Sequence, residues 1–292
     1  MGWLTVNQSV GTSKGTNKKK DVKLVPALLN IYLRSKKKTT LKITGKINTD
    51  TNQAIIDFQK HTFKKKTVDS KVDPGGKTYK ALIKTRKKSF TRKAITQPTY
   101  GIVTWNSEGT EGGRYHSRKL HVPNGNSGLT LGRGYDCKQK KQAKLSKELT
   151  AAGVKAKYVK ILKKSSGLKG KKAKQFIIDN DLLDYEITPV VQKKLFKTSY
   201  DDEAKVVKKI SERKNIEKAY GKTEWNTLNK YIKDIAIDLK FRGDYHSTSR
   251  KFIQNLLLTM ILLLLQNKYQ KNQTGTAFLK IDLIDVKIIW QK

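Results

Sequence analysis

Cysteine is almost absent from this sequence of 292 residues, and acidic side chains are scarce. Cys137 is the only cysteine, so no intramolecular disulfide can form. No base is arranged near it in the pattern, which argues against a catalytic thiol. The four histidines show no metal-ligand spacing, and the motifs CxxC and HExxH are both missing. The sequence therefore predicts neither a metal site nor another cofactor.

The shortage of acid leaves a very large positive charge. There are 24 Asp and Glu against 63 Lys and Arg, which gives a formal net charge of +39. The excess is mostly lysine, in runs such as 18–20, 36–38 and 64–66. Such a surface attracts polyanions, namely nucleic acid, anionic lipid or an acidic cell wall. Arginines are few, and no zinc finger, RNP strand or basic region with heptads is present. Specific nucleic-acid recognition is therefore not expected.

Long apolar runs are also missing. The longest, from Asn255 to Leu265, is about half of the roughly 20 residues that a spanning helix needs, so we expect no transmembrane segment. The start of the chain lacks a basic region followed by an apolar core and a cleavage site. We therefore expect synthesis in the cytoplasm without a secretory signal peptide.

A glycine-rich stretch from Gly101 to Asp136 differs from the lysine-rich sequence around it. It holds the carboxylates of Glu108, Glu111 and Asp136, with Thr130 in a short turn-and-strand between them. Glycoside hydrolysis needs an acid for the leaving oxygen and a second carboxylate across the sugar. Solvated loop charges are the alternative interpretation of the same residues.

Three pieces of the sequence, in order, resemble the muramidase domain of pesticin and related bacterial and phage-like lysozymes. They are TWNSEG (104–109), HVPNGNSGLTLGRGYD (121–136) and DLKFRGDY (238–245). By position, the resemblance implies that Glu108, Thr130 and Asp136 are catalytic. Ordinary phage lysozymes carry the second carboxylate six positions before the threonine, where this chain has Asn124. In this chain the second carboxylate, Asp136, lies six positions after Thr130, which is the arrangement of the pesticin-like branch.

The resemblance implies a bacteriolytic glycoside hydrolase that cuts the glycan strand of peptidoglycan. Glu108 would be the general acid, while Asp136 would stabilise positive charge on the sugar or orient a water with Thr130. Glu111, three residues further on, is expected to be dispensable. The residues expected to bind substrate are Trp105, Tyr115, Arg133 and Tyr135.

A second resemblance concerns residues 21–85, where apolar spacing predicts three short helices. Pro26 is placed in the first turn of the first helix, and Asp50 is a candidate N-cap of the second. The pattern is similar to the three-helix peptidoglycan-binding module that accompanies cell-wall hydrolases. The core of any small helical bundle is the alternative. The matching positions are Val25, Leu28, Leu29, Asn30, Gly45, Ile47, Thr51, Ala54, Ile55, Phe58 and Gln59.

The rest of the chain is assigned around these two parts. Residues 1–20 are polar and predict a flexible segment, and 86–98 are basic and predict a linker. Residues 99–254 are assigned to the lysozyme-like domain, in which Thr188 precedes Pro189 as an N-cap. Apolar positions from Trp225 to Leu239 predict one further helix.

Residues 255–292 form an atypical tail. Reading one nucleotide back after Gln254, codons exist that would give IVDNDF and later WNSVPKDRFDRR, which resemble the usual ending of pesticin-like proteins. We therefore consider a one-base slip in the coding sequence, which would put the activity of this chain in doubt.

The expected fold class is mainly α / α+β, with a small three-helix domain followed by a lysozyme-like α+β domain. The expected partner is peptidoglycan, reached in the periplasm or cell wall by a secretion system, phage lysis or import. An immunity protein would be a further partner. The alternative function is a non-catalytic protein that binds peptidoglycan or another polyanion by charge.

Overall fold

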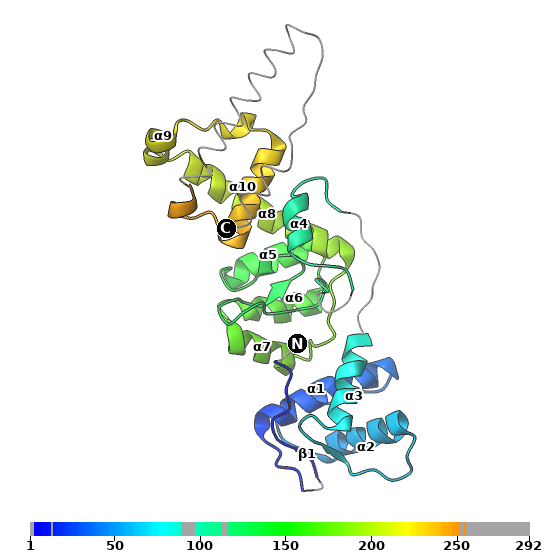
Figure 1. Ribbon diagram of the computed structural model, residues 1–292. Coiled ribbons are helices and arrows are strands. Elements are labelled where there is room, and N and C mark those ends of the chain that lie inside the picture. The colour runs from blue at the N-terminus through cyan, green and yellow to red at the C-terminus, as the bar shows by residue number, and fades with distance from the viewer. Residues whose placement is uncertain (1–2, 13, 89–96, 113–115, 251–253, 255–292) are drawn as a thin grey trace. The chain divides into compact units, whose positions relative to one another are not determined.

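The computed structural model describes residues 3–12, 14–88, 97–112, 116–250 and 254 (Figure 1). They are mainly helical with a few short strands, which agrees with the predicted class. The chain forms two compact units, Met1–Glu203 and Ala204–Lys292. The first unit contains the predicted module, the predicted linker and much of the predicted lysozyme-like domain, whose boundaries stay a prediction. Of the predicted linker, residues 89–96 lie outside the described residues.

The described residues of the N-terminal segment, 3–12 and 14–20, pack against the rest of the unit, which differs from the flexible segment predicted over 1–20. Strand β1 (Val10–Gly11) pairs antiparallel with β2 (Lys71–Val72). Leu4 and Val6 are 1% exposed and Val10 is fully buried, so these apolar side chains anchor the segment in the core. Further backbone N–H groups of the segment are bound by the carboxylate of Asp21.

The three predicted N-terminal helices are confirmed as α1 (Lys19–Ser35), α2 (Thr49–Phe63) and α3 (Lys77–Lys88). Two details differ. Pro26 lies inside α1 rather than in its first turn, because the helix already begins in the lysine run. The N-cap of α2 is Asn48, whose side chain accepts from the N–H of Thr51, rather than Asp50.

The remainder of the first unit carries α4 (Ile102–Ser107), strands β3 (Thr130–Leu131) and β4 (Tyr135–Asp136), and a group of helices. These helices are α5 (Gln142–Ala152), α6 (Ala156–Leu162), the short η1 (Lys163–Ser165), α7 (Gly170–Asp179) and the first part of α8 (Pro189–Ser211). The hydroxyl of Thr188 accepts from the N–H of Val191, which confirms the predicted cap of α8.

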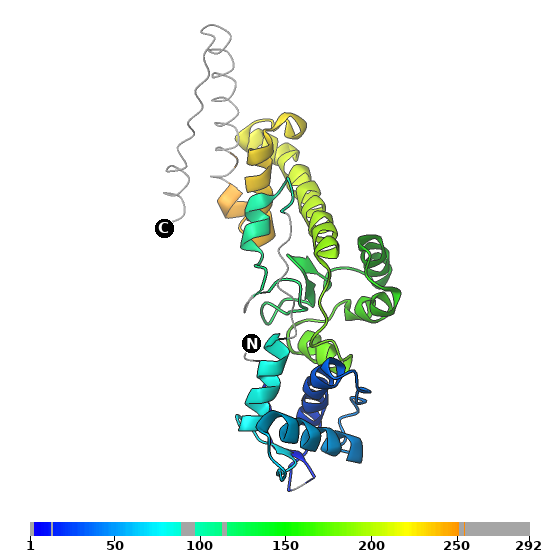
Figure 2. The same cartoon turned by 90° about the vertical axis from the view of Figure 1, so that its right-hand side faces the viewer.

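Polar contacts join α1 to the turn that follows α7, and the two helices lie side by side in both views (Figures 1 and 2). Arg34 donates to the carboxylates of Asp181 and Asp184, at 2.6 and 2.7 Å for its two terminal nitrogens. Asn30, which is fully buried, also donates to Asp181, at 3.0 Å. Arg86 of α3 donates to the carbonyl of Leu183. The N-terminal helices thus share their packing with residues that come much later in the chain.

The second unit contains the end of α8, then α9 (Lys214–Tyr220), η2 (Trp225–Thr227) and α10 (Lys230–Arg242). The predicted single helix from Trp225 to Leu239 is wrong, because the side chain of Asn229 caps a new helix by accepting from the N–H of Tyr231. The tail 255–292 lies outside the described residues. Within the described part, no helix is long and apolar enough to cross a membrane.

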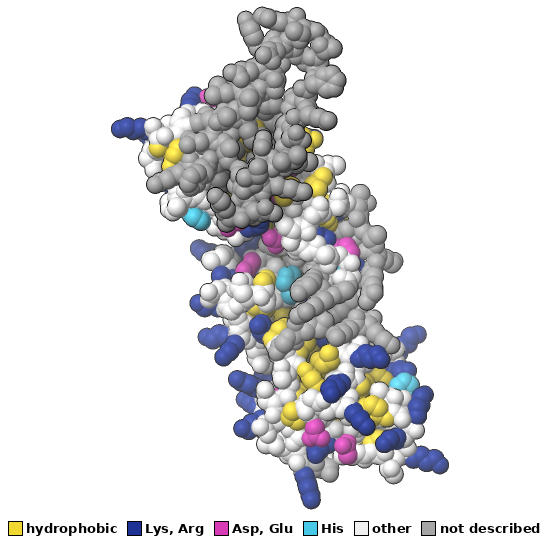
Figure 3. Space-filling model, viewed as in Figure 1, with side chains coloured by type: hydrophobic (Ala, Val, Ile, Leu, Met, Phe, Trp, Pro, Cys, Tyr) yellow, Lys and Arg dark blue, Asp and Glu magenta, His cyan; other side chains and the backbone are white. Residues whose placement is uncertain are grey.

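Most of the charged side chains on the visible surface of the first unit are basic, over the N-terminal helices and along the edge formed by α5, α6 and α7 (Figure 3). Acidic side chains are sparse on the same face. The charge excess read from the sequence is therefore a property of the surface.

If the N-terminal segment is part of the core, Leu4→Ala should destabilise the protein by about 2–5 kcal/mol, the usual cost of emptying a buried leucine site. Urea unfolding measures this free energy. Lys20→Ala, at an exposed position of α1, is the control and should change it by less than about 0.5 kcal/mol. Equal stability of wild type and Leu4→Ala would show that the segment is not anchored.

Candidate active site

A two-stranded hairpin carries two of the three predicted catalytic residues. Strands β3 and β4 pair so that Thr130 lies opposite Asp136 and Leu131 lies opposite Tyr135. The turn between them is made by residues 132–134, where Gly132 and Gly134 have φ values of +60° and +79°. Glycine adopts these angles without the strain that a Cβ would add. The hairpin thereby places the hydroxyl residue and a carboxylate residue across from each other.

The carboxylate of Asp136 is held by the backbone. One oxygen accepts from the N–H of Gly128 at 3.1 Å, and the other from the N–H of Lys138 at 2.7 Å. A Cβ at position 128 would overlap the Asp136 carboxylate. Residue 128 is therefore glycine because the carboxylate occupies the space where a side chain would begin.

Thr130 is buried, and its hydroxyl donates to the carbonyl of Gly128 at 3.4 Å. Its backbone pairs with His121, whose N–H and carbonyl bond to the carbonyl and N–H of Thr130. Burial lowers the pKa of His121, and the nearby charge of Asp136 partly opposes that shift. Its Nδ1 donates to the carbonyl of Lys119. His121 is thus a neighbour of Asp136 that the sequence did not single out.

Glu108 is half-buried at the end of α4, where its N–H donates to the carbonyl of Thr104. The guanidinium of Arg133, at the tip of the hairpin, donates to the carbonyls of Trp105 and Gly109, which lie on either side of Glu108 in the chain. It also stacks on the Trp105 ring, 4.3 Å from its centroid. Burial lowers the pKa of Arg133, while the carboxylates of Glu111 and Glu108 oppose the shift.

Arg133 therefore connects the turn that carries Glu108 to the hairpin that carries Thr130 and Asp136. The three predicted catalytic residues belong to one small substructure, although Glu108 is well separated from the other two in the sequence. Its parts are joined by hydrogen bonds from a buried guanidinium rather than by a shared strand or helix.

Three of the four predicted substrate-binding residues are buried in the structure. Trp105 is 1% exposed and packs edge-on against Phe196, with the ring centroids 5.1 Å apart. Arg133 is 4% exposed, and Tyr135 is fully buried with its hydroxyl donating to Glu148 at 2.6 Å. Burial raises the pKa of Tyr135, and the bond to Glu148 adds to this. In this structure these three side chains contact other protein groups, and their role in substrate binding stays a prediction. The fourth, Tyr115, lies outside the described residues.

Glu111 is held by hydrogen bonds from several side chains. Its carboxylate accepts from Ser117, Arg118 and Gln192 at 3.2, 2.8 and 2.8 Å, and Arg133 lies 3.4 Å away. The side chain of Arg118 is 2% exposed. Two buried arginines thus contact this one carboxylate, so we expect Glu111 to matter for stability, while its dispensability for activity stays a prediction.

His116 extends the same cluster. The N–H of Gly112 donates to its Nδ1 at 2.7 Å, so Nδ1 is the acceptor and Nε2 carries the proton. Nε2 lies 2.8 Å from Glu186, which also pairs with Arg118 at 3.1 Å. Sequence reasoning missed this cluster. The available signal was the density of His, Ser and Arg over 116–118 within a glycine-rich loop.

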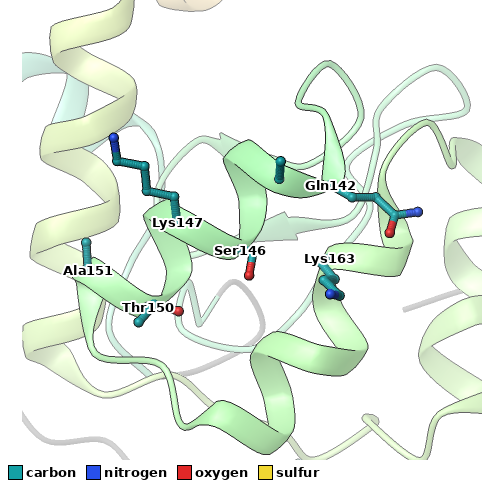
Figure 4. Close-up of a pocket in the computed structure, with 7 residues that line it drawn as sticks. Gln142, Ser146, Lys147, Thr150, Ala151 and Lys163 are labelled. Atoms are coloured by element: carbon teal, nitrogen blue, oxygen red, sulfur yellow. The ribbon is translucent and has the colours of Figure 1, made fainter.

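An open depression on the surface of α5 is lined by none of the predicted catalytic residues (Figure 4). Its walls are Gln142, Ala143, Ser146, Lys147, Thr150 and Ala151 of α5, with Lys163 of η1. We place the candidate site at the hairpin, because ionisable groups are held there by specific bonds. In the described part of the chain, no group of three or more His, Cys, Asp or Glu is arranged to hold a metal ion.

Residues 101–276, more than half of the chain, match a family model described as a domain of unknown function, DUF8812. The chain belongs to this family. The matched segment contains Glu108, the hairpin and all of the following helices up to α10. Comparisons with curated proteins and with solved structures find no match.

The family match also bears on the tail. It continues past Gln254 to residue 276 and includes the apolar run from Asn255 to Leu265. The match thus extends beyond the predicted end of the domain at residue 254. The one-base slip after Gln254 stays a hypothesis.

Because Glu111 neutralises two buried arginines, Glu111→Gln should lower the free energy of unfolding by about 3–5 kcal/mol. Thermal and urea unfolding measure the loss. Glu224→Gln is the matched control, since Glu224 is 63% exposed and pairs only with exposed Lys222 among the ion pairs described, so it should be close to neutral. Similar stabilities for the two variants would remove Glu111 from the supporting network.

The buried thiol gives another test. Burial raises the pKa of Cys137 to about 12, so the thiolate that reacts with disulfide reagents is scarce at about pH 8. We expect the folded protein to react with an aromatic disulfide at least about 100-fold more slowly than the urea-unfolded protein. Equal rates would show that Cys137 is exposed.

Proposed function

We propose that the protein is a muramidase that hydrolyses glycosidic bonds in the glycan strand of peptidoglycan. The observation that carries the proposal is the arrangement of the two carboxylates. Asp136 is fixed by two backbone N–H groups opposite Thr130, and Arg133 ties that hairpin to the turn of half-buried Glu108. Glycosidases require two carboxyl groups held on a rigid frame. The resemblance to pesticin-like muramidases implies catalytic roles for the same three residues.

The proposed roles follow from the surroundings of each group. Glu108 donates its proton to the leaving oxygen of the glycosidic bond. Asp136, presented between strand and loop, stabilises positive charge on the sugar or orients a water with Thr130. His121 and the Glu111 cluster act on the position of these groups and do not touch the sugar. Each of these steps uses only side chains of the chain and a water.

The N-terminal helices are proposed to assist binding to the wall. The polar positions in the resemblance serve the fold: Gln59 bonds to Asp69, Lys71 and Thr78, and Asn30 to both backbone groups of Leu41. These residues therefore support the resemblance in fold, and a wall-binding surface would have to use other side chains. The target would be reached in the periplasm or wall after delivery, with an immunity protein as a further proposed partner.

Substitution of Glu108 is the central test. Glu108→Gln keeps the shape of the side chain but has no acidic proton, so release of fragments from purified peptidoglycan should fall by at least about 10²–10⁴-fold. Asp136→Asn should be comparably damaging, and Thr130→Ala should be milder. Mass spectrometry of the fragments identifies the bond that is cut.

Glu224→Gln is the control for this series, because Glu111→Gln is expected to unfold the supporting network. Each variant should first show the unfolding temperature of the wild type. Full activity of Glu108→Gln, or fragments cut at an amide bond, would contradict the proposal.

The second candidate function is a non-catalytic protein that binds the wall or another polyanion by charge, which the surface lysines favour. Such a protein would sediment with purified sacculi but leave the turbidity of permeabilised bacteria unchanged. Its binding would weaken steeply with salt, because the Debye length falls from about 30 Å at 0.01 M to about 10 Å at 0.1 M.

A further inference from the structure

Acidic residues do not accompany the lysines evenly along the first unit. Nine lie between Lys155 and Lys174, and no Asp or Glu occurs between Glu148 and Asp179. No arginine occurs in that interval either. We call these nine residues the lysine surface; seven are exposed and two, Lys163 and Lys174, are half-buried. They are carried by α6 and the residue before it, η1, α7 and the turn before α7.

The charges on this surface have no acidic partner among the residues that the structure describes. Elsewhere in the unit, lysines such as Lys23, Lys140 and Lys144 pair with carboxylates at 2.9–3.0 Å. Among the described residues, no carboxylate lies within ion-pair distance of the nine. Concentrated charge of one sign raises the local concentration of an anionic ligand.

The lysine surface adjoins the candidate active site. The N–H of Gly170, at the start of α7, donates to the carbonyl of Ser127 at 3.0 Å. The N–H of Gly167 donates to the carbonyl of Lys138 at 3.1 Å. Ser127 and Lys138 flank Gly128 and Asp136, so these bonds fix the lysine-bearing segment to both sides of the hairpin base. A polymer bound by the lysines would therefore run close to the proposed catalytic carboxylate.

The side chains of the surface indicate the chemistry of the ligand. Lysine offers a hydrated point charge suited to isolated phosphates, and it lacks the planar fork with which arginine reads base edges. The exposed large apolar residues in the described part of the unit are Ile102, Val103 and Val190, and none belongs to the lysine surface. Insertion into lipid is thus disfavoured. An open depression whose lining includes Ser146, Thr150 and Lys163 lies at its border (Figure 4).

We propose that the lysine surface binds a polyol-phosphate chain attached to the wall glycan and so guides that glycan to the adjacent hairpin. The choice of a wall polymer over nucleic acid rests on the proposed function. The binding itself rests on nine lysines that have no ion pair with a described carboxylate, and on the bonds from Gly167 and Gly170 of the same segment to residues 138 and 127.

The test compares two triple variants of the full chain that carry the same net charge. Lys164, Lys171 and Lys172, all exposed on the lysine surface, are changed to Gln. In the control, exposed Lys205, Lys209 and Lys214 of α8 and α9 are changed to Gln. Binding to poly(glycerol phosphate) is measured by calorimetry at several salt concentrations. A third variant with Arg at positions 164, 171 and 172 keeps the charge and should bind like wild type.

We expect the lysine-surface variant to bind at least about tenfold more weakly at about 0.05 M salt. The slope of log K against log salt should fall by about 2, since each of the three lysines that no longer neutralises a phosphate removes about 0.7. The control should stay within about twofold of wild type. Equally weakened binding in the two variants, or no binding by wild type, would overturn the proposal. Equal or tighter binding of duplex DNA would overturn the choice of a wall polymer.

Digestion of sacculi stripped of phosphate polymers separates this proposal from the proposed function. There the lysine-surface variant and wild type should release glycan fragments at equal rates. Phosphate binding without any fragment release would refute the muramidase and leave the binding surface. Fragment release without phosphate binding would refute the binding surface and leave the muramidase.

Discussion

The candidate site depends on the hydrogen bonds that the Arg133 guanidinium donates to the carbonyls of Trp105 and Gly109. This guanidinium lies in the protein interior, and it is tolerated there because carbonyls, an indole ring and a carboxylate surround it. Without it, the turn after α4 and the β3–β4 hairpin would lose the hydrogen bonds that join them. The identity of a single side chain at the hairpin tip thus determines where Glu108 lies relative to the strand that carries Asp136.

The demand for charge compensation explains the surroundings of this arginine. Glu111 neutralises Arg133 and also Arg118, Arg118 in turn pairs with Glu186, and Glu186 faces His116. The two arginines and His116 are buried, and the half-buried carboxylates of Glu111 and Glu186 offset part of the cost of burying them. A rigid support of this kind is what a pair of catalytic carboxylates needs, since small displacements weaken proton transfer.

Local rules predicted the elements that they determine. The cap at Thr188 and the three N-terminal helices follow from turn chemistry and apolar spacing, and the structure has them. Prediction failed where the outcome depends on partners distant in the chain. Residues 1–20 look polar, yet Leu4 and Val10 are buried against elements that come later.

The same limit applies to the candidate site. The spacing of Thr130 and Asp136 across a glycine turn was readable, because a hairpin brings the two residues together locally. Aromatic and basic residues nearby looked like ligand contacts, but Trp105, Arg133 and Tyr135 are buried. The network around Glu111 uses Gln192, 81 positions away, and no local pattern could indicate it.

The contacts of α1 have a consequence for folding during synthesis on the ribosome. Arg34 binds Asp181, which follows it by 147 residues. At a synthesis rate of about 5–20 residues per second, that partner emerges roughly 7–30 s after Arg34. During this interval the N-terminal helices carry an incomplete polar face and a strongly positive charge. Their like charges repel neighbouring chains, which protects the unfinished protein from aggregation until residues near 184 close the unit.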